Sequence, residues 1–326
     1  MAGTLEKLRA GCRPDRRALF SLGAMLFVFG NMAWGKISPG NLRCEYMENP
    51  AVVDTRAPRL SWINHASSGQ ERGRSQQAYR IVVSTSKEKL QKGDYDAWDS
   101  GRQNSSVSRL VHYAGAPLKS AGDYWWRVMV WDDKDRASDW SEPAYWGMGL
   151  LEPADWKARW IGVPWQGEAP RRVLSPVKYE QRQYPAPLFR KTFRAKGKIT
   201  SAKAFVTGLG YFELYINGEK VGDDYLVPNF TNYTVREDIK HYGISIDNKF
   251  RGYRVMYLAY DITHMLRRGD NVAGAILGNG FYDCTTGWVC SFGSPRLLCQ
   301  IEITYADNTK EMICTCLLYT SPSPRD

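Results

Sequence analysis

The stretch Tyr124-Trp125-Trp126-Arg127-Val128-Met129-Val130-Trp131 decides the fold of the first half of the chain. Successive side chains of an extended strand point to opposite faces, so the even-numbered residues of this stretch face one way and the odd-numbered residues the other. One face is then wholly aromatic and β-branched, whereas the other carries Arg127. The alternation predicts a half-buried strand, and residues 41–151 show no sustained helical periodicity.

Short β-branched or aromatic runs, broken by Gly, Asp, Asn and Ser, continue this pattern on both sides. The predicted strands are Arg59–Ile63, Ala78–Ser84, Val107–His112, Tyr124–Asp132 and Ala144–Gly149. About seven short strands in about 110 residues predict a β-sandwich of the immunoglobulin or fibronectin type III kind over residues 41–151. Trp62, Trp126 and Trp140 are interpreted as core and hairpin packing, with stacking platforms for sugar rings as the alternative.

A second β-rich module is predicted over residues 152–315, after a linker at Leu151–Arg159 that contains a short helical turn. Asn217-Gly218 is a strong signal for a two-residue hairpin turn, because both residues tolerate positive φ. Antiparallel strands of this number predict a jelly-roll-like sandwich. The predicted strands are Leu188–Phe193, Lys203–Gly208, Tyr211–Ile216, Arg254–Asp261, Asn271–Leu277 and Leu298–Tyr305.

Composition bounds the class of protein. The 326 residues are 43% hydrophobic, 24% charged and 13% aromatic, which excludes a disordered tail, a collagen, a coiled coil and a polytopic membrane protein. The length suggests two domains. The formal net charge is +10, and residues 1–35 hold part of it, with five Lys or Arg against two acidic residues. The remaining basic residues are scattered, so a nucleic-acid role is the weakest hypothesis.

Both ends of the chain are interpreted as lying outside the fold. Arg16 and Arg17 precede the apolar run Ala18–Phe29, and Ala33-Trp34-Gly35 follows. This order predicts a helical signal peptide over residues 1–35 and export to the periplasm or the extracellular space. Twelve apolar residues fall short of the roughly 20 that span a bilayer, so an uncleaved anchor is only the alternative.

The last residues, 316–326, read CLLYTSPSPRD and follow an unfinished hairpin. They closely resemble one reading frame of a transposon adapter used in sequencing libraries, so we interpret them as an artefact. A genuine Ser/Pro-rich tail is the alternative. If residues 316–326 are an artefact, we expect the chain to be the front part of a longer protein.

The cysteines give no sign of a metal site. No Cys-x-x-Cys occurs between residues 36 and 315, and no histidine lies within four residues of a cysteine. We expect neither a metal nor a cofactor. Isolated buried cysteines are the default interpretation, with a Cys284–Cys290 bridge as the alternative. The five cysteines concerned are Cys44, Cys284, Cys290, Cys299 and Cys314.

Local signatures recur in a fixed order along both modules. The first module has Pro58-Arg59-Leu60-Ser61-Trp62, Trp98-Asp99-Ser100-Gly101, Tyr124-Trp125-Trp126-Arg127-Val128 and Trp140-Ser141-Glu142. The second has Gly208-Leu209-Gly210-Tyr211-Phe212-Glu213, Tyr260-Asp261-Ile262-Thr263 and Leu277-Gly278-Asn279-Gly280-Phe281-Tyr282. Together they resemble the front end of bacterial α-L-rhamnosidases of glycoside hydrolase family 78.

The resemblance implies an exported enzyme that removes terminal α-L-rhamnose from glycans or glycosides by inverting hydrolysis. It also implies that the two catalytic carboxylic acids lie in an (α/α)6-barrel domain that follows these β-domains. We therefore expect this chain alone to be inactive, with the missing catalytic domain as its intramolecular partner. No catalytic role is assigned to the acidic residues near the best motifs, namely Glu213, Asp223, Asp224 and Asp283.

The second module resembles a family domain that helps to recognise substrate, here a rhamnose-containing glycan. Flat aromatic residues with polar neighbours suit a pyranose, whose face stacks on a ring while its hydroxyls take hydrogen bonds. The candidates for carbohydrate binding are Tyr211, Asn279, Tyr282 and Trp288, with strand-end packing as the alternative interpretation.

Two hypotheses of other classes stay open. A free-standing secreted carbohydrate-binding or adhesion protein would need the same two sandwiches. An interaction scaffold built on the fibronectin-like module would leave the second module unexplained.

Overall fold

The computed structural model describes residues 37–66, 73–163, 185–231, 233, 254–284 and 290–316. The predicted signal peptide and most of the segment 316–326 lie outside the described residues, and so does Trp288. Residues from Lys36 onward form one compact unit. In the described parts of the chain, no helix is long and apolar enough to span a membrane.

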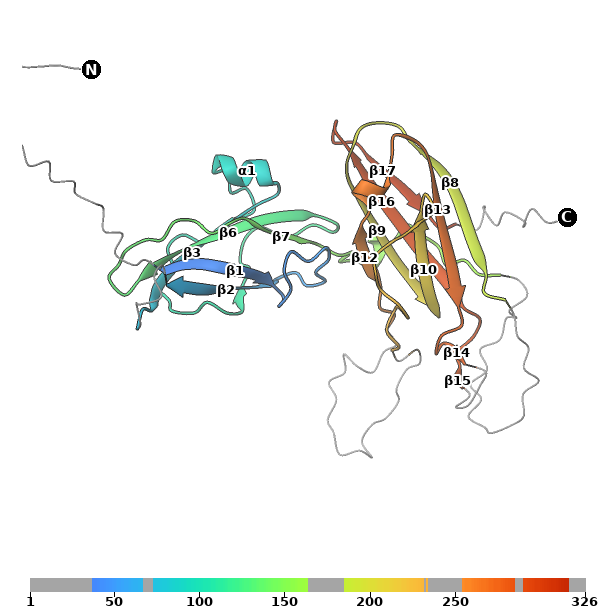
Figure 1. Cartoon of the computed structure of the whole chain (residues 1–326), viewed down its shortest axis with the longest axis horizontal. Coiled ribbons are helices and arrows are strands. Elements are labelled where there is room, and N and C mark those ends of the chain that lie inside the picture. Colours follow the sequence, from blue (N-terminus) through green and yellow to red (C-terminus); the bar gives the residue numbers. More distant parts are fainter. Residues whose placement is uncertain are drawn as a thin grey trace, which may run out of the picture. The chain divides into compact units, whose positions relative to one another are not determined.

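The chain is all-β and builds two antiparallel sandwiches, as predicted (Figure 1, blue to green and yellow to red). The first sandwich packs a sheet in the order β1-β2-β5 against a sheet in the order β4-β3-β6-β7. Its strands are β1 Ile37–Cys44, β2 Arg59–Ala66, β3 Gln76–Ser84, β4 Trp98–Asp99, β5 Val111–His112, β6 Asp123–Asp132 and β7 Ala144–Gly147.

Strand β6 alternates as the sequence predicts. Trp126, Val128 and Val130 have no exposed surface, whereas Trp125 and Arg127 are half-buried on the outer face. The core also holds Trp62 and Trp146, each at most 1% exposed. Burying aromatic side chains of this size supplies much of the stability of a small sandwich. Trp62 and Trp126 are therefore core residues.

Trp140 has the packing role that was predicted for it. Its ring lies 4.7 Å from the Arg127 guanidinium carbon, and the ring of Tyr95 lies on the same arginine at 5.9 Å. The hydroxyls of Ser138 and Ser141 accept hydrogen bonds from the backbone of β6, which fixes the segment that carries Trp140. The contact with the guanidinium makes the Trp140 ring a cation–π partner within the first sandwich.

One helix of the first sandwich has no counterpart in the prediction. Helix α1, Lys87–Lys92, begins after Ser86, whose hydroxyl accepts from the Lys89 backbone N–H at 3.2 Å, and ends at Gly93 with φ 78°. Cap residues determine so short a helix, because six residues are too few to show a helical period. Its buried residue, Leu90, ties it to the sandwich.

The second sandwich packs a sheet in the order β11-β10-β13-β8 against a sheet in the order β12-β9-β16-β17. The chain moves between these sheets at most of its connections, as in a jelly roll. Its strands are β8 Leu188–Ala195, β9 Ile199–Leu209, β10 Tyr211–Ile216, β11 Glu219–Lys220, β12 Leu258–Asp261, β13 Gly269–Gly278, β16 Arg296–Tyr305 and β17 Lys310–Cys314. A small hairpin pairs β14 Asp283–Cys284 with β15 Cys290–Ser291.

The turn predictions of the second sandwich are confirmed. Asn217 and Gly218 have φ of 53° and 91° and connect β10 to β11, with Ile216 opposite Glu219. The helical turn predicted in the linker is a 3-10 turn, η1, at Pro153–Asp155. A second 3-10 turn, η5, covers Thr263–Met265 just before Gly269.

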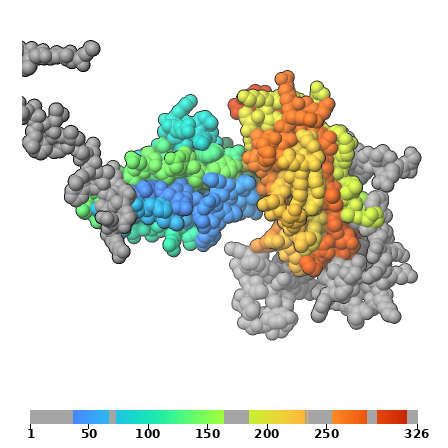
Figure 2. Space-filling model, in the orientation of Figure 1, coloured from blue at the N-terminus to red at the C-terminus, as the bar shows by residue number. Residues whose placement is uncertain are grey.

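Figure 2 shows each sandwich as a closely packed body on the face in view.

Three predicted strands are shorter than expected: Ala144–Gly149 ends at Gly147, and two others begin four residues late, where side chains bond their backbone groups. Only Val111–His112 of the predicted strand Val107–His112 becomes a strand, since the Val107 carbonyl accepts from the Gln76 amide at 3.0 Å. Only Leu258–Asp261 of the predicted strand Arg254–Asp261 becomes a strand, since the Met256 carbonyl accepts from the Thr207 hydroxyl at 2.6 Å. A side-chain donor competes with the neighbouring strand for such a carbonyl.

The prediction of buried free cysteines is confirmed for Cys44 and Cys299, whereas the free thiol of Cys314 is only half-buried. Cys44 and Cys299 are buried free thiols, and burial raises the pKa of both. The backbone register places Cys284 directly opposite Cys290. Their side chains lie outside the described part of the structure, so a bridge between them stays a hypothesis.

Candidate functional site

Strands β14 and β15 lie at one end of the second sandwich (Figure 1), and the rings of several aromatic residues contact one another there. We call this group the aromatic end, and it comprises Tyr211, Phe230, Tyr233, Phe281, Tyr282 and Phe292. Tyr211 begins β10, Phe281 and Tyr282 follow β13, and Phe292 follows β15. Three segments that are distant in sequence therefore meet at this end.

The rings contact one another mainly edge to face. Tyr233 lies 5.0 Å from Tyr282 and 5.3 Å from Phe292, measured between ring centroids. Phe281 lies 6.1 Å from Tyr211 and 6.0 Å from Phe230. Such T-shaped pairs stabilise a cluster by about 0.5–1.5 kcal/mol each beyond burial. The rings therefore hold one another in place.

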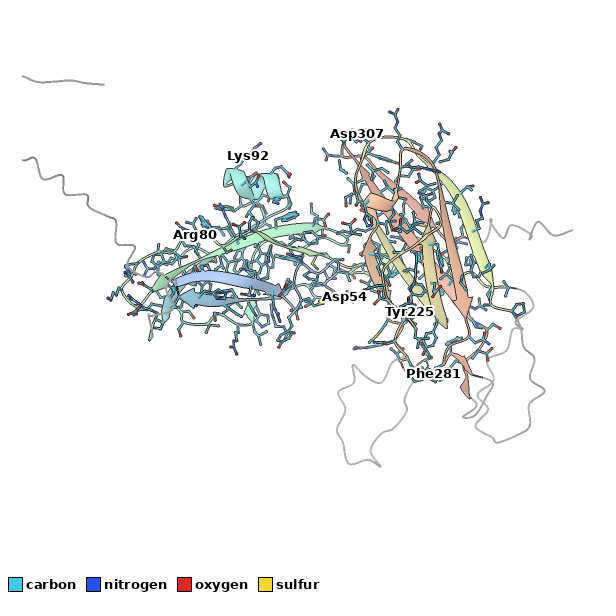
Figure 3. The ribbon with its side chains drawn as sticks, viewed as in Figure 1. Asp54, Arg80, Lys92, Tyr225, Phe281 and Asp307 are labelled. Carbon is cyan, nitrogen blue, oxygen red and sulfur yellow. The ribbon has the colours of Figure 1, made fainter. Side chains whose placement is uncertain are left out.

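Two of the rings reach solvent. Phe230 is 53% exposed and Phe281 is 57% exposed, and their planes stand at 73° to each other. Figure 3 shows Phe281 at the tip of this end, below the strands of the sandwich. Exposed apolar rings that sit together cost solvation free energy, so they commonly mark a contact surface. Together Phe230 and Phe281 form an apolar corner.

Two glycines make the base of the aromatic end possible. Gly210 has φ 120°, and a Cβ at this position would lie 2.2 Å from the Gly278 carbonyl oxygen. Gly280 has φ 52°, and its Cβ would lie 3.1 Å from the Tyr211 backbone nitrogen. Gly210 thus forms a tight turn between β9 and β10. This close approach sets Tyr211 against the turn that carries Phe281.

The predicted sugar-binding residues fall partly within this surface. Tyr211 and Tyr282 belong to the aromatic end, and the Tyr282 hydroxyl donates to the Phe292 carbonyl at 3.2 Å. Asn279 is half-buried in the same turn, where its carbonyl accepts from the Asp283 backbone N–H at 3.3 Å. Trp288 lies outside the described residues.

Sequence reasoning missed the residues that are most exposed there. Phe281 stood within a quoted motif, but nothing in its local pattern distinguished it from packing residues. Phe230 lies in a stretch without strand periodicity, two residues after Pro228. Solvent exposure of both rings depends on contacts between β10, β13 and the segment after β11, which the sequence alone does not reveal.

The acidic residues named beforehand take part in local hydrogen bonds. Glu213 accepts from the Tyr215 hydroxyl at 2.7 Å, and Asp224 accepts from the Tyr260 hydroxyl at 2.9 Å. Burial, and then the bond to Asp224 and its charge, raise the pKa of the Tyr260 phenol. Within the described ranges, no group of three or more His, Cys, Asp or Glu side chains is arranged to hold a metal ion.

Comparison with known proteins assigns both sandwiches. Residues 39–152 match the model of the Rha78A-like N-terminal immunoglobulin domain. Residues 197–321 match the model of the α-L-rhamnosidase N-terminal domain. These are the N-terminal domains of the α-L-rhamnosidase family. The second match includes residues 316–321, which are part of the predicted artefact.

Relatives of the rhamnosidase domains agree over most of the chain. An α-L-rhamnosidase of Formosa agariphila is 34% identical over 280 residues, which is 80% of this chain and 27% of the relative. One from an Alteromonas species is 34% identical over 82% of this chain and 26% of its own length. The chain thus spans about a quarter of the curated relatives that it matches.

Solved rhamnosidase structures show the same fold. The α-L-rhamnosidase from Dictyoglomus thermophilum superposes with a TM-score of 0.68 at 33% identity, over 85% of this chain and 29% of that one. The enzyme from Aspergillus terreus gives a TM-score of 0.64 at 26% identity, over 85% and 28%. Both structures are of far longer chains, and the name α-L-rhamnosidase refers to each of those whole chains.

Proposed function

We propose that this chain forms the N-terminal β-region of an exported α-L-rhamnosidase and that its second sandwich helps to recognise a rhamnose-containing glycan. The two N-terminal family domains in series, with about a quarter of the relatives' length covered, carry this proposal. The rhamnosidase reaction itself, an inverting hydrolysis of terminal α-L-rhamnosides, belongs in this proposal to a catalytic (α/α)6 barrel of the parent protein.

The chemistry of inversion supports this division of labour. One carboxylic acid must protonate the leaving oxygen while a second carboxylate, about 6.5–9.5 Å away, activates water. In the described residues, Glu213 and Asp224 instead accept hydrogen bonds from the hydroxyls of Tyr215 and Tyr260. We assign recognition and support to these domains and assign proton transfer to the parent's barrel.

The aromatic end suits a 6-deoxy sugar. The apolar face of a pyranose stacks on a ring, and its hydroxyls need donors and acceptors at the rim. L-rhamnose carries a methyl group where most hexoses carry a hydroxymethyl group. The apolar corner of Phe281 and Phe230 would accept both the ring face and this methyl group, with Asn279 and Tyr282 among the polar neighbours.

Export and the outer boundaries belong to the same proposal. A signal peptide at residues 1–35 would bring the domains to the periplasm or beyond the cell. The proposed organisation is a fibronectin III-like sandwich over 41–151, the rhamnosidase N-terminal sandwich over 152–315 and an artefactual tail over 316–326.

A binding titration tests recognition, and a turnover assay tests the assignment of catalysis. We expect the chain to bind L-rhamnose in NMR titrations, and we expect no release of p-nitrophenol from p-nitrophenyl α-L-rhamnoside. Phe281→Ala should weaken binding by about tenfold, which corresponds to about 1.4 kcal/mol. Ile63→Ala is the matched control, because Ile63 is 53% exposed, close to the 57% of Phe281, but lies in the first sandwich.

Three results would separate the possibilities. Turnover by this chain would overturn the assignment of catalysis to another domain. No binding, or equal binding by the Phe281→Ala variant, would remove the recognition role and leave the sandwiches as supports. Binding by this chain, together with a coding sequence that has no helical domain after the two sandwiches, would favour a free-standing carbohydrate-binding protein.

A further inference from the structure

Strand β9 is buried on both of its faces. Ala202, Ala204 and Val206 point into the core of the second sandwich. Lys203, Phe205 and Thr207 point the other way, yet they are only 6%, 0% and 2% exposed. The outer face of an antiparallel sheet is commonly wet. Something in the chain therefore covers the outer face of the sheet β12-β9-β16-β17.

Apolar contacts identify the cover. Phe205 packs in a cluster with Ala121 and Leu150, which belong to the first sandwich and the start of the linker. Trp156 from the linker stands perpendicular to Tyr257 at 5.3 Å. The Tyr257 hydroxyl in turn accepts from the Leu150 backbone N–H at 3.0 Å. The linker thus lies against the sheet.

Gln300 fixes the linker by hydrogen bonds. This residue of β16 has no exposed surface. Its side-chain oxygen accepts from the backbone N–H groups of Lys157 at 2.6 Å and Ala158 at 3.3 Å. Its side-chain nitrogen donates to the Asp155 carbonyl at 3.1 Å. A buried amide that bonds only backbone groups specifies one position of the linker.

Lys203 makes the charged contact. Its Nζ lies 2.5 Å from Asp123 Oδ1 at the start of β6, and the Lys203 side chain is 8% exposed against 34% for Asp123. The Tyr145 hydroxyl of β7 donates to the same carboxylate oxygen. Gly147 leaves the room that this requires, because a Cβ there would lie 2.9 Å from the Lys203 Nζ. An ammonium from the second sandwich is thus enclosed by the first.

We propose that Lys203, Asp123, Gln300 and Tyr257 form a lock that joins the two sandwiches into one rigid, cooperatively folding unit. Domains within a chain move relative to each other unless their interface is large and well satisfied. Here the buried ammonium of Lys203 is paired with the carboxylate of Asp123, and the buried amide of Gln300 bonds backbone groups of the linker. The lock does not depend on sugar recognition, so its failure and that of the proposed function are distinguishable.

Calorimetry of the whole chain tests the lock. The wild type should unfold in one transition whose calorimetric and van't Hoff enthalpies agree. Asp123→Asn removes the carboxylate and leaves a buried ammonium, so we expect two separate transitions. Asp270→Asn is the control, because it removes a comparable ion pair with Arg194 that is 79% exposed at the aspartate. Ile303→Val lowers the stability of the second sandwich alone and should keep a single transition.

Amide hydrogen exchange gives a second readout, in case the Asp123→Asn variant does not fold. Tyr257→Phe removes only the hydroxyl and should raise exchange at the Leu150 amide by tenfold or more. The Val128 and Val130 amides in the first core should stay unchanged in this variant. Two transitions in the wild type, or an Asp123→Asn variant that melts like Asp270→Asn, would overturn the lock. Rapid wild-type exchange at the Leu150, Lys157 and Ala158 amides would overturn it as well.

Discussion

The indole N–H of Trp62 donates to the side-chain oxygen of Gln76 at 3.0 Å, and both residues are buried in the first sandwich. The Gln76 amide nitrogen also donates to the carbonyls of Ser105 and Val107, each at 3.0 Å. One glutamine therefore satisfies a core tryptophan and holds a segment that does not pair as a strand.

Gln76→Met is expected to destabilise the chain strongly. Methionine has a similar shape, but it leaves the buried Trp62 N–H without its partner, at a cost of about 1–3 kcal/mol. It also removes the hydrogen bonds to the Ser105 and Val107 carbonyls, which are only partly buried. Urea denaturation would show a lower midpoint with an unchanged slope. Gln77→Met is the control, because the neighbouring Gln77 is exposed and should change the midpoint little. Equal midpoints for the two variants would refute this role.

Gly210→Ala is expected to disturb the aromatic end. A Cβ would lie 2.2 Å from the Gly278 carbonyl at φ 120°, so the turn must move at a cost of roughly 1–3 kcal/mol or more. Thermal unfolding should show the loss, and rhamnose binding should weaken with it. Gly218→Ala is the matched control, since φ is 91° there but nothing lies within 4 Å of the added carbon. Gly218→Ala should lower the free energy of unfolding only by the cost of holding alanine at a positive φ, about 1 kcal/mol.

Glu45 should stabilise the fold in a pH-dependent manner. Its carboxylate accepts from the Arg59 backbone N–H at 2.6 Å and from Arg59 Nε at 3.0 Å. The side-chain bond from Arg59 is the largest cause that lowers the pKa of Glu45. A lowered pKa gives stability that is full above the unfolded value, about 4.3, and is lost as pH falls through the folded value.

The Glu45→Gln variant measures this contribution. It should melt below the wild type at pH 7, and the difference in Tm should shrink as pH falls below 4. Glu48→Gln is the control, because Glu48 forms its ion pair with Arg43 in solvent. The Arg43 side chain is 50% exposed and the Glu48 side chain is 61% exposed. A difference between wild type and Glu45→Gln that stays constant from pH 7 to pH 3 would contradict the assignment.

Cys44 and Cys299 should resist alkylation in the folded chain. Burial raises the pKa of the Cys299 thiol to about 12 and that of Cys44 still further, so little thiolate forms at pH 8. Mass spectrometry after iodoacetamide treatment should find both unmodified until denaturant is added. Modification of either at the rate of the unfolded chain would show that its site opens readily.

Local patterns predicted much of the fold. The alternation of Tyr124 to Trp131 specified β6 and its buried face, and Asn217-Gly218 specified a hairpin, because both depend on neighbouring residues only. The apolar corner forms because Phe230 and Phe281, about fifty residues apart in the sequence, contact each other. The candidate site was therefore only half predicted. Lys203 within a buried run was a signal of a covered sheet, but its partner Asp123 lies 80 residues away.

Edge strand β8 has a further consequence. It ends the sheet β11-β10-β13-β8 and carries Arg190 and Arg194 with their side chains exposed. An open edge offers free backbone groups to another molecule, and like charges oppose such pairing when two copies approach. These arginines should therefore keep the domains from aggregating through this edge at high protein concentration, without contributing to the folded core.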